Sequence, residues 1–245
     1  MRKFGLIGKN IEYSFSRTYF KNKFETEGIR DVSYVNFDIP TINDFKGSVK
    51  HTPNLKGLNV TIPYKETIIP YLDALSADAE SIGAVNTIKI DNAGKYIGHN
   101  TDYFGFKKAL QPYLKPHHKK ALILGTGGAS KAVAFALEEF GIHYKFVSRI
   151  ASNNTTLTYN SLTEESIKDN LLIINCTPLG THPNVEYCPN IPYPSITKEH
   201  ILFDLIYNPE KTKFLSFGEK QHATIINGLK MLELQAEKAW EIWNT

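Results

Sequence analysis

Cysteine is scarce in this sequence, which has two in 245 residues, Cys176 and Cys188. Their spacing matches no metal-ligand or redox motif, and a chain of this length can bury a core that needs no structural disulfide. We therefore expect neither a metal site nor a disulfide.

Long hydrophobic runs are missing as well. No stretch approaches the ~20 apolar residues of a membrane span, and the amino-terminal MRKFGLIGKN has too brief an apolar run for a secretion signal. The sequence also lacks a strong charge of one sign, because its net charge is +3 and its longest basic run is HHKK at residues 117–120. We expect a cytoplasmic protein with no membrane or nucleic-acid partner.

What the sequence does contain is an alternation of strand and helix patterns. The first hundred residues include the strand-like KFGLIG, SYVNFDI, GLNVTI and VNTIKI and the amphipathic SRTYFKNKFE. The turn residues DNAGK predict that VNTIKI and YIGHN form a hairpin. A helix is expected from Thr101 or Asp102 to about Leu110, with a domain junction at the following QPYLKPHHKK.

The second half predicts a parallel sheet. ALILG, HYKFVS and LLIINC are typical of strands in such a sheet, and AVAFALEEFG is typical of a helix that stops at Gly141. GLKMLELQAEKAWEIWNT closes the chain as a long helix. The fold class is therefore α/β.

A glycine-rich turn, GTGGAS at residues 125–130, joins ALILG to the next helix. Such a turn brings backbone N–H groups close to a pyrophosphate, and Ser130 at the third fingerprint position is small enough for helix packing. We favour dinucleotide binding over a turn needed only for chain reversal. The second strand ends in Ser148 and Arg149 without an acidic residue, which favours NADP over NAD.

Several polar residues interrupt apolar patterns. Asn86 falls on the apolar face of AVNTIKI and needs a backbone, water or ligand partner, and Gln235 falls in the apolar stripe of the last helix. For Asn86 a ligand and a backbone partner remain equally open, and Gln235 fits a helix edge as well as a ligand site.

Other candidates lie at the ends of predicted elements. Asp102 and Ser16 would each serve as an ordinary helix N-cap, whereas Ser14 has no such role. Asn59 and Thr61 share one strand face and point to where Lys65 emerges. By spacing alone, Lys65 is more typical of a solvated side chain than of a catalyst.

Together these segments resemble the shikimate dehydrogenase family over nearly the whole chain. The motifs are, in order, Ser14-Phe15-Ser16, GLNVTIPYKE, IGAVNTI, GHNTDYFGF, GTGGAS, SRI, INCTPLG, DLIYNP and NGLKMLELQA. The resemblance implies a two-domain enzyme that reduces 3-dehydroshikimate to shikimate with NADPH in aromatic biosynthesis.

The resemblance also implies roles for single residues, with Lys65 and Asp102 as the catalytic pair. Ser14 and Ser16 would hold the substrate carboxylate. The ring hydroxyls and the pocket wall would be supplied by Asn59, Thr61, Asn86, Gln235 and Tyr207. The NADP-binding residues would be Gly125, Thr126, Gly127, Gly128, Ala129, Ser148, Arg149, Thr177 and Gly228.

The sequence departs from the family pattern in its first loop, where Asn10, Tyr13 and Arg17 replace proline, histidine and proline. Ser148-Arg149-Ile150 keeps the arginine of the cofactor clamp but lacks its two polar neighbours, and Thr126 replaces an alanine. These changes leave the loop shape and the strictness of the NADP preference open.

We expect an amino-terminal substrate-binding domain with a mainly parallel sheet, residues 1–102 plus 229–245, and a Rossmann-like domain, residues 103–228. A monomer or homodimer whose domains close on the substrate would fit this layout. One alternative is a quinate/shikimate dehydrogenase that uses NAD or both cofactors. A second is a non-catalytic sensor of a cyclic hydroxy acid or NADP.

Overall fold

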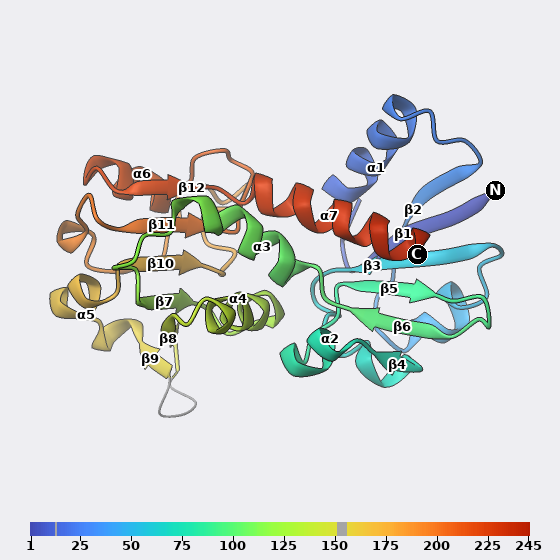
Figure 1. Ribbon diagram of the computed structural model, residues 1–245, viewed down its shortest axis with the longest axis horizontal. Helices are drawn as coiled ribbons and strands as arrows, with labels where there is room; N and C mark the ends of the chain where they lie inside the picture. Colours follow the sequence, from blue (N-terminus) through green and yellow to red (C-terminus); the bar gives the residue numbers. More distant parts are fainter. Residues whose placement is uncertain (13, 151–155) are drawn as a thin grey trace. The chain divides into compact units, whose positions relative to one another are not determined.

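The computed structural model describes residues 1–12, 14–150 and 156–245, so Tyr13 of the first loop lies outside the described residues. The chain divides into two compact units (Figure 1). Unit 1 comprises Met1–Thr101 with Ala236–Thr245, and unit 2 comprises Asp102–Gln235. No helix in the described ranges is both long and apolar enough to cross a membrane.

Unit 1 is built on a six-stranded sheet with the order β2-β1-β3-β5-β6-β4. Strand β1 pairs in parallel with β2 and β3, and β5 runs antiparallel to both β3 and β6. Strand β4 is parallel to β6. The strands are β1 (Arg2–Gly8), β2 (Val32–Asp38), β3 (Leu55–Val60), β4 (Ala74–Leu75), β5 (Thr87–Ile90) and β6 (Tyr96–His99).

The predicted hairpin of unit 1 is present. Strands β5 and β6 pair directly, and the Asp91 carboxylate closes the turn by accepting hydrogen bonds from the backbone N–H groups of Ala93 and Lys95 at 2.9 and 2.8 Å. The helical segments of unit 1 are α1 (Phe15–Thr26), η1 (Phe45–Val49), η2 (Ile69–Tyr71) and α2 (Ala77–Ile82).

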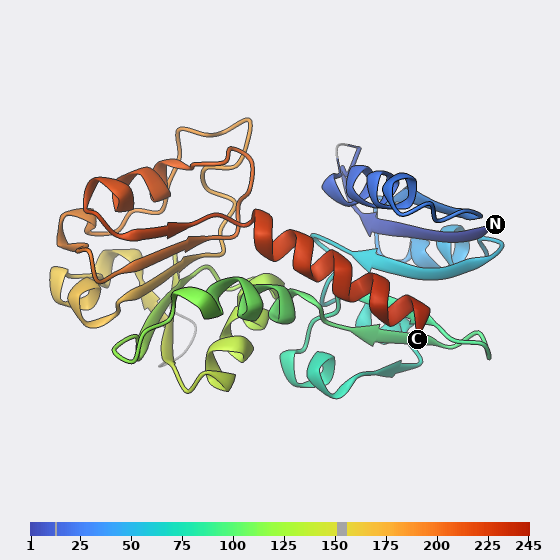
Figure 2. The same ribbon diagram turned by 45° about the horizontal axis from the view of Figure 1, so that its top comes forward.

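An aromatic core holds α1 and the end of α7 (Leu229–Asn244) in unit 1. Helix α1 lies alongside β1 and β2 in both views (Figures 1 and 2). Phe4 stacks on Trp243 with ring centroids 4.9 Å apart, and the Trp243 indole donates a 3.0 Å hydrogen bond to the Ile88 carbonyl. A side chain at Gly57 would clash with this indole, so the helix can lie directly on the sheet only at a glycine.

Unit 2 is built on a parallel six-stranded sheet with the order β12-β11-β10-β7-β8-β9. The arrows of β7, β10 and β11 point the same way in Figure 1. Counted from β7, this is the 3-2-1-4-5-6 order of a dinucleotide-binding sheet, with the reversal of strand order between β7 and β10. The strands are β7 (Lys120–Leu124), β8 (His143–Ser148), β9 (Thr156–Thr158), β10 (Leu172–Asn175), β11 (Ile201–Asp204) and β12 (Thr224–Ile226).

Helices cover both faces of this sheet, which explains why its central strands are continuous apolar runs. One face carries α3 (Asp102–Leu110) and α4 (Gly128–Glu139), and the other carries α5 (Glu164–Asp169) and α6 (Lys213–Lys220). The short segments η3 (Gln111–Tyr113), η4 (Tyr159–Ser161) and η5 (Tyr193–Ser195) complete unit 2.

The fold confirms the predicted α/β class, with a mainly parallel first sheet and a Rossmann-like second one. One predicted strand is offset, because GLNVTI covers residues 57–62 whereas β3 spans Leu55–Val60. Assignment of the substrate and cofactor roles to residues 1–102 plus 229–245 and to residues 103–228 stays a prediction.

Candidate active site

The two serines of the first loop lie at the start of α1. The helix begins at Phe15, and Ser14 is its N-cap, with its hydroxyl accepting a 3.3 Å hydrogen bond from the Arg17 backbone N–H. The prediction that Ser16 is the N-cap is therefore wrong, because Ser14 has that role. Ser16 lies in the first turn of the helix.

Asn59 is a buried amide on β3 whose polar atoms all have protein partners. Its Oδ1 accepts a 2.8 Å hydrogen bond from the Tyr34 hydroxyl. Its Nδ2 donates to the Thr87 hydroxyl at 3.2 Å and to the Asn86 carbonyl at 3.4 Å. Burial of Asn59 is thus offset by hydrogen bonds that also fix the orientation of its amide.

Asn86 immediately precedes β5. It is therefore not part of the strand, although its predicted position on an apolar face assumed that it was. Its Oδ1 accepts a 2.6 Å hydrogen bond from the Thr101 backbone N–H, and its Nδ2 donates to the Thr101 hydroxyl at 3.0 Å. A backbone partner is therefore present, and it fixes the residue that directly precedes Asp102.

Lys65 lies in the turns after β3 and is half-buried. Its carbonyl accepts a 2.7 Å hydrogen bond from the Val85 backbone N–H, which ties this turn to the segment that leads into Asn86. Thr61 lies directly after β3, and its backbone N–H donates to the Ile7 carbonyl at 2.9 Å. The Ile62–Pro63 peptide between them is cis.

Asp102 is the first residue of α3 and is 6% exposed. A carboxylate in the first helical turn interacts favourably with the helix dipole. Thr101 occupies the preceding position, which supports one of the two N-cap positions expected from the sequence.

Gln235 and Tyr207 belong to unit 2. Gln235 is buried on α7, and its amide donates a 2.9 Å hydrogen bond to the Leu232 carbonyl. A Cβ atom added at Gly105 would lie 3.1 Å from the Gln235 Cβ. A glycine at position 105 is therefore needed for α3 and α7 to approach this closely. Tyr207 follows β11 at the surface, and partial burial raises the pKa of its phenol.

The predicted cofactor residues lie at or after the carboxyl ends of parallel strands in unit 2. Gly125 follows β7 with a φ of +106°, a conformation that favours glycine, and Gly127 is the N-cap of α4. A side chain built at Gly127 would meet no atom within 4 Å, so a phosphate could approach this helix start. Residues 125–129 therefore fit a dinucleotide. The remaining cofactor candidates are Ser148 as the last residue of β8, Arg149 directly after it, Thr177 after β10 and Gly228 after β12.

Two polar residues that sequence reasoning missed hold Thr177 in place. Asn175 Oδ1 accepts hydrogen bonds from the Thr177 backbone N–H and hydroxyl at 3.0 and 2.7 Å, and its Nδ2 donates to Asp204 at 3.0 Å. Burial raises the pKa of Asp204 to about 6, although hydrogen bonds from Thr212, Ile206 and Asn175 oppose the rise. Asn175 ends the apolar strand β10, and Asp204 ends the apolar strand β11. A polar residue that interrupts an apolar run is the pattern that singled out Asn86, and the same pattern could have identified these two residues.

In unit 1 the missed residues are Tyr34, Thr87 and Thr101. They alternate with two predicted site residues in one hydrogen-bonded series of side chains: Tyr34, Asn59, Thr87, Asn86 and Thr101. The structure thus brings Asn59 and Asn86 together through Thr87, a residue that the sequence patterns did not single out.

Comparison with known proteins gives concordant matches. A model of the shikimate dehydrogenase substrate binding domain matches residues 6–88. An NADP(+) shikimate dehydrogenase from Methanosphaera stadtmanae is 38% identical over 98% of this chain and 90% of its own length.

Two solved structures match all or nearly all of the chain. Shikimate dehydrogenase 1 from Peptoclostridium difficile is 39% identical, with a TM-score of 0.85 over 100% of this chain and 92% of its own. A quinate dehydrogenase from Corynebacterium glutamicum, in complex with NAD, is 26% identical, with a TM-score of 0.86 over 99% and 93%.

Proposed function

The chain belongs to the shikimate dehydrogenase family, and from that premise we propose that Lys65 and Asp102 catalyse its reaction. The protein is an NADP-dependent oxidoreductase that acts on a CH–OH group. Its reaction is the reversible reduction of 3-dehydroshikimate to shikimate, a step towards chorismate and the aromatic amino acids. The main support is the 38% identity to an NADP-dependent relative over 98% of the chain.

NADPH, when bound, supplies the hydride. Reduction of a ketone builds negative charge on its oxygen, and the Lys65 ammonium can stabilise that charge and donate a proton to it. The Asp102 carboxylate can accept hydrogen bonds from the lysine and from a substrate hydroxyl, which orients both. In the oxidation direction the neutral lysine accepts the hydroxyl proton.

Substrate binding is assigned to polar groups of unit 1 together with Gln235 and Tyr207. Ser14 and Ser16 would donate hydrogen bonds to the carboxylate at the α1 N-terminus, where the helix dipole favours an anion. Asn59, Thr61, Asn86 and Gln235 would bind ring hydroxyls. Because the Asn86 amide already bonds to Thr101, its second role is to fix the start of α3.

For NADP, the backbone of residues 125–129 would meet the pyrophosphate, and Ser148 and Arg149 would meet the adenosine 2′-phosphate. Thr177, after β10, and Gly228, after β12, would line the cofactor site at the same edge of the sheet. Gly228 has a direct reason to be glycine, because a side chain there would clash with the Leu205 carbonyl.

A second candidate function is oxidation of quinate with NAD. The likeness to an NAD-bound quinate dehydrogenase supports it, as does Ile150 in place of a polar clamp residue. Arg149 favours the first candidate, because its guanidinium can pair with a phosphate that NAD lacks.

The test is to measure kcat/KM for shikimate and for quinate, each with NADP and with NAD. We expect shikimate with NADP to exceed every other pair by at least about tenfold, a difference that one charged contact can supply. A higher value for quinate with NAD would replace the proposal by the second candidate. Binding of NADP without oxidation of either acid would instead indicate a sensor.

A further inference from the structure

The loop after β10 packs against the glycine-rich turn after β7. A Cβ atom added at Gly125 would lie 3.2 Å from the Thr177 Cγ2 methyl and 3.3 Å from the Cys176 carbonyl oxygen, so this loop covers one face of the glycine. Strands β7 and β10 are neighbours, and the strand order reverses between them. A dinucleotide binds across a parallel sheet at such a reversal. Thr177 therefore supports the turn that is proposed to meet the pyrophosphate.

The hydroxyl of Thr177 is already used within the protein. It donates a 2.7 Å hydrogen bond to Asn175 Oδ1 and accepts a 3.3 Å hydrogen bond from the Leu179 backbone N–H. A hydroxyl has only one hydrogen to donate, and the ionised phosphate oxygens of NADP are acceptors. The Thr177 hydroxyl can therefore donate to a cofactor phosphate only if it gives up its bond to Asn175.

The amide of Asn175 is fixed in this orientation by its other partners. Its Nδ2 donates to Asp204 Oδ1 at 3.0 Å and to the Leu179 carbonyl at 3.4 Å, so its Oδ1 faces Thr177. Burial raises the pKa of Asp204 to about 6, and above pH 7 this carboxylate is therefore mainly ionised and can only accept. The Thr212 hydroxyl holds it from the other side at 2.6 Å. Asp204 thus determines which end of the Asn175 amide reaches Thr177.

We propose that Asn175 and Asp204 are positioning residues that act through Thr177 on the glycine-rich turn and so set the affinity for the NADP pyrophosphate. The inference rests on the proposed function, since the turn is assigned to the cofactor there. The Thr177 hydroxyl orients the loop after β10, and its methyl supports Gly125. Neither role requires a hydrogen bond from the hydroxyl to the cofactor.

Thr177→Val and Thr177→Ser separate a supporting residue from a ligand, with the Kd of NADPH measured from its fluorescence at pH 7.5. Valine keeps the methyl but removes the bond to Asn175, and we expect Kd to rise roughly three- to tenfold, the effect of one hydrogen bond. Serine keeps the hydroxyl but removes the methyl beside Gly125, and we expect Kd to rise about two- to fivefold. A rise in Thr177→Val alone would make the hydroxyl a direct ligand and overturn the inference, as would no rise in either variant.

Adenosine 2′-monophosphate separates positioning of the turn from a general loss of structure. It carries the phosphate that is assigned to Ser148 and Arg149 but has no pyrophosphate. Its Kd, measured by displacement of NADPH, should change by less than about twofold in both Thr177 variants, because the turn at Gly125 is not engaged. Equal losses for this fragment and for NADPH would mean that Thr177 is only structural.

Asn175→Ala extends the test to the buried pair. If Asn175 acts through Thr177, the double variant Asn175→Ala/Thr177→Val should bind NADPH within about twofold of the weaker single variant. Losses that multiply would mean that the two residues act independently, which would overturn the inference. Asn175 is buried, so Asn175→Ala is the variant at risk of not folding; the two Thr177 variants then decide the question, because each changes one small group of a half-buried side chain.

Thr197→Val is the matched control in unit 2. The Thr197 hydroxyl hydrogen-bonds to His200 Nδ1 at 3.0 Å and accepts from the Glu199 backbone N–H at 3.3 Å, which resembles the bonding of Thr177. Thr197 precedes β11, however, and so lies at the opposite edge of the sheet. Its loss should leave the Kd of NADPH within about twofold of the wild type, and a larger rise would contradict the inference.

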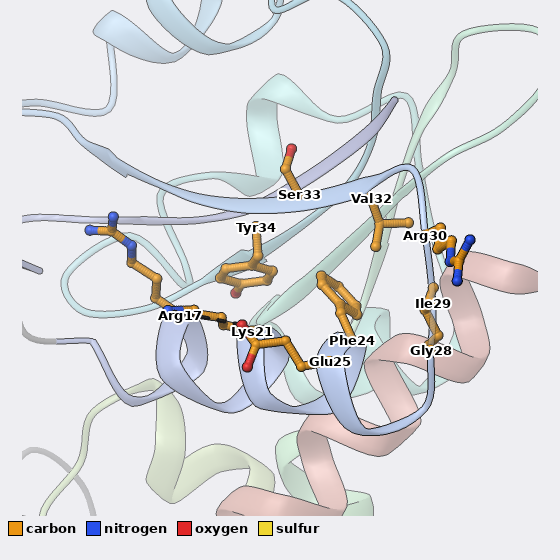
Figure 3. A pocket seen from close by; sticks show the side chains of 10 residues that line it. All are labelled: Arg17, Lys21, Phe24, Glu25, Gly28, Ile29, Arg30, Val32, Ser33 and Tyr34. Carbon is orange, nitrogen blue, oxygen red and sulfur yellow. Dashed lines mark ion pairs between the residues drawn. The ribbon is translucent and has the colours of Figure 1, made fainter.

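Arg30→Gln controls for phosphate that binds away from the cofactor site. Arg30 lines a pocket of about 700 Å³ between α1 and β2 in unit 1, together with the cations Arg17 and Lys21 (Figure 3). This variant should also leave the Kd of NADPH within about twofold. A loss equal to that of Thr177→Val would contradict an effect specific to the turn at Gly125.

Failure of the proposed function would have a different signature. A wild-type protein that binds NADPH but oxidises no shikimate would refute the proposed reaction. The same dissociation constants would still decide whether Asn175 and Asp204 act through Thr177, because they are measured without turnover.

Discussion

Buried polar residues at strand ends position predicted ligand-binding residues within each unit. Asn59 and Asn86 do so in unit 1, and Asn175 and Asp204 do so in unit 2. An unpaired buried amide or carboxylate would cost about 1 to 3 kcal/mol or more. Each instead bonds to a neighbouring loop, so the hydrogen bonds that offset burial also position residues that were predicted to bind ligands.

Asp204 gives the clearest pH prediction. Its pKa in the folded chain is raised to about 6 from an ordinary value of 3.8. The folded state therefore holds more protons than the unfolded state between these values, and the contribution of Asp204 to stability is lost as the pH rises through about 6. Two pKa units correspond to about 3 kcal/mol.

Asp204→Asn removes this titration. The free energy of unfolding of the variant minus that of the wild type should rise by up to about 3 kcal/mol between pH 4 and pH 7 in urea denaturation. Asp169→Asn is the control, because that exposed carboxylate lies 3.9 Å from Lys120 at the surface, and its difference should stay within about 0.5 kcal/mol. A flat difference for Asp204→Asn would contradict the assigned pKa.

Sequence patterns found the polar residues that interrupt apolar runs, such as Asn86 and Gln235. They could not find Tyr34 or Thr87, because tyrosine and threonine are ordinary residues in strands and mark no exception. They also chose the wrong capping serine, since Ser14 and Ser16 have equal propensity and only the backbone decides which one precedes the helix.

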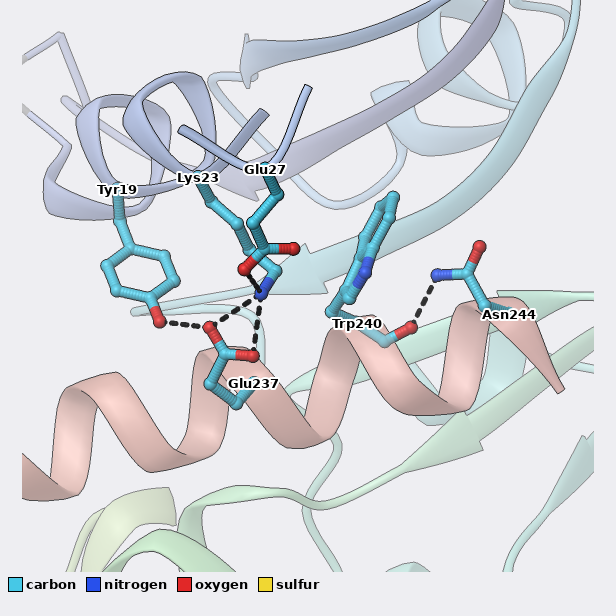
Figure 4. Close-up of polar contacts among 6 residues, drawn as sticks. All are labelled: Tyr19, Lys23, Glu27, Glu237, Trp240 and Asn244. Carbon is cyan, nitrogen blue, oxygen red and sulfur yellow. Dashed lines mark hydrogen bonds and ion pairs between the residues drawn. The ribbon is translucent and has the colours of Figure 1, made fainter. Parts of the chain in front are cut away.

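At the scale of elements, one polar cluster ties α1 to the end of α7 in unit 1 (Figure 4). The Lys23 ammonium is nearly buried and lies 2.8 Å from Glu237 Oε2 and 2.6 Å from Glu27 Oε1. The Tyr19 hydroxyl also hydrogen-bonds to Glu237. Although burial alone would raise the pKa of Glu237, the bonds from Lys23 and Tyr19 hold it below its ordinary value.

Glu237→Gln should weaken this tie. We expect the free energy of unfolding at pH 7 to fall by about 1 kcal/mol, a modest loss because water screens the half-exposed carboxylate. A depressed carboxylate pKa stabilises the folded state above the unfolded pKa, and that stabilisation is lost as the pH falls through the folded value. The difference between variant and wild type should therefore shrink towards pH 3 in urea denaturation.

Glu241→Gln is the matched control on the same helix. Glu241 pairs with Lys238 at 2.7 Å on an exposed face, so its loss should cost about 0.3 kcal/mol at most. Equal costs for the two variants would contradict a special role for the α1–α7 cluster.

Element types were predicted better than element ends. The period of apolar residues identified β7, α4 and the β5–β6 hairpin, because these patterns reflect burial directly. The end of β3 at Val60 depends on its pairing with β1 and β5, which a local pattern does not contain.

At the scale of the whole molecule, two different sheets share one chain. Unit 2 has the strand order of a dinucleotide-binding domain, and unit 1 contains the hydrogen-bonded polar series that leads from Tyr34 to Thr101. A Rossmann-like domain with parallel strands was expected for unit 2 from the glycine-rich turn and its flanking strands. The hydrogen-bonded series of unit 1 was not, because it joins residues that are far apart in sequence.

The central claim is that Lys65 is the acid–base residue of an NADP-dependent shikimate dehydrogenase. The most direct measurement is kcat and KM for NADP-dependent shikimate oxidation by Lys65→Ala beside the wild type. We predict that kcat falls by about 10² to 10⁴, the usual contribution of proton transfer, while KM changes by less than about fivefold. A Lys65→Ala protein with kcat within about threefold of the wild type would contradict the account.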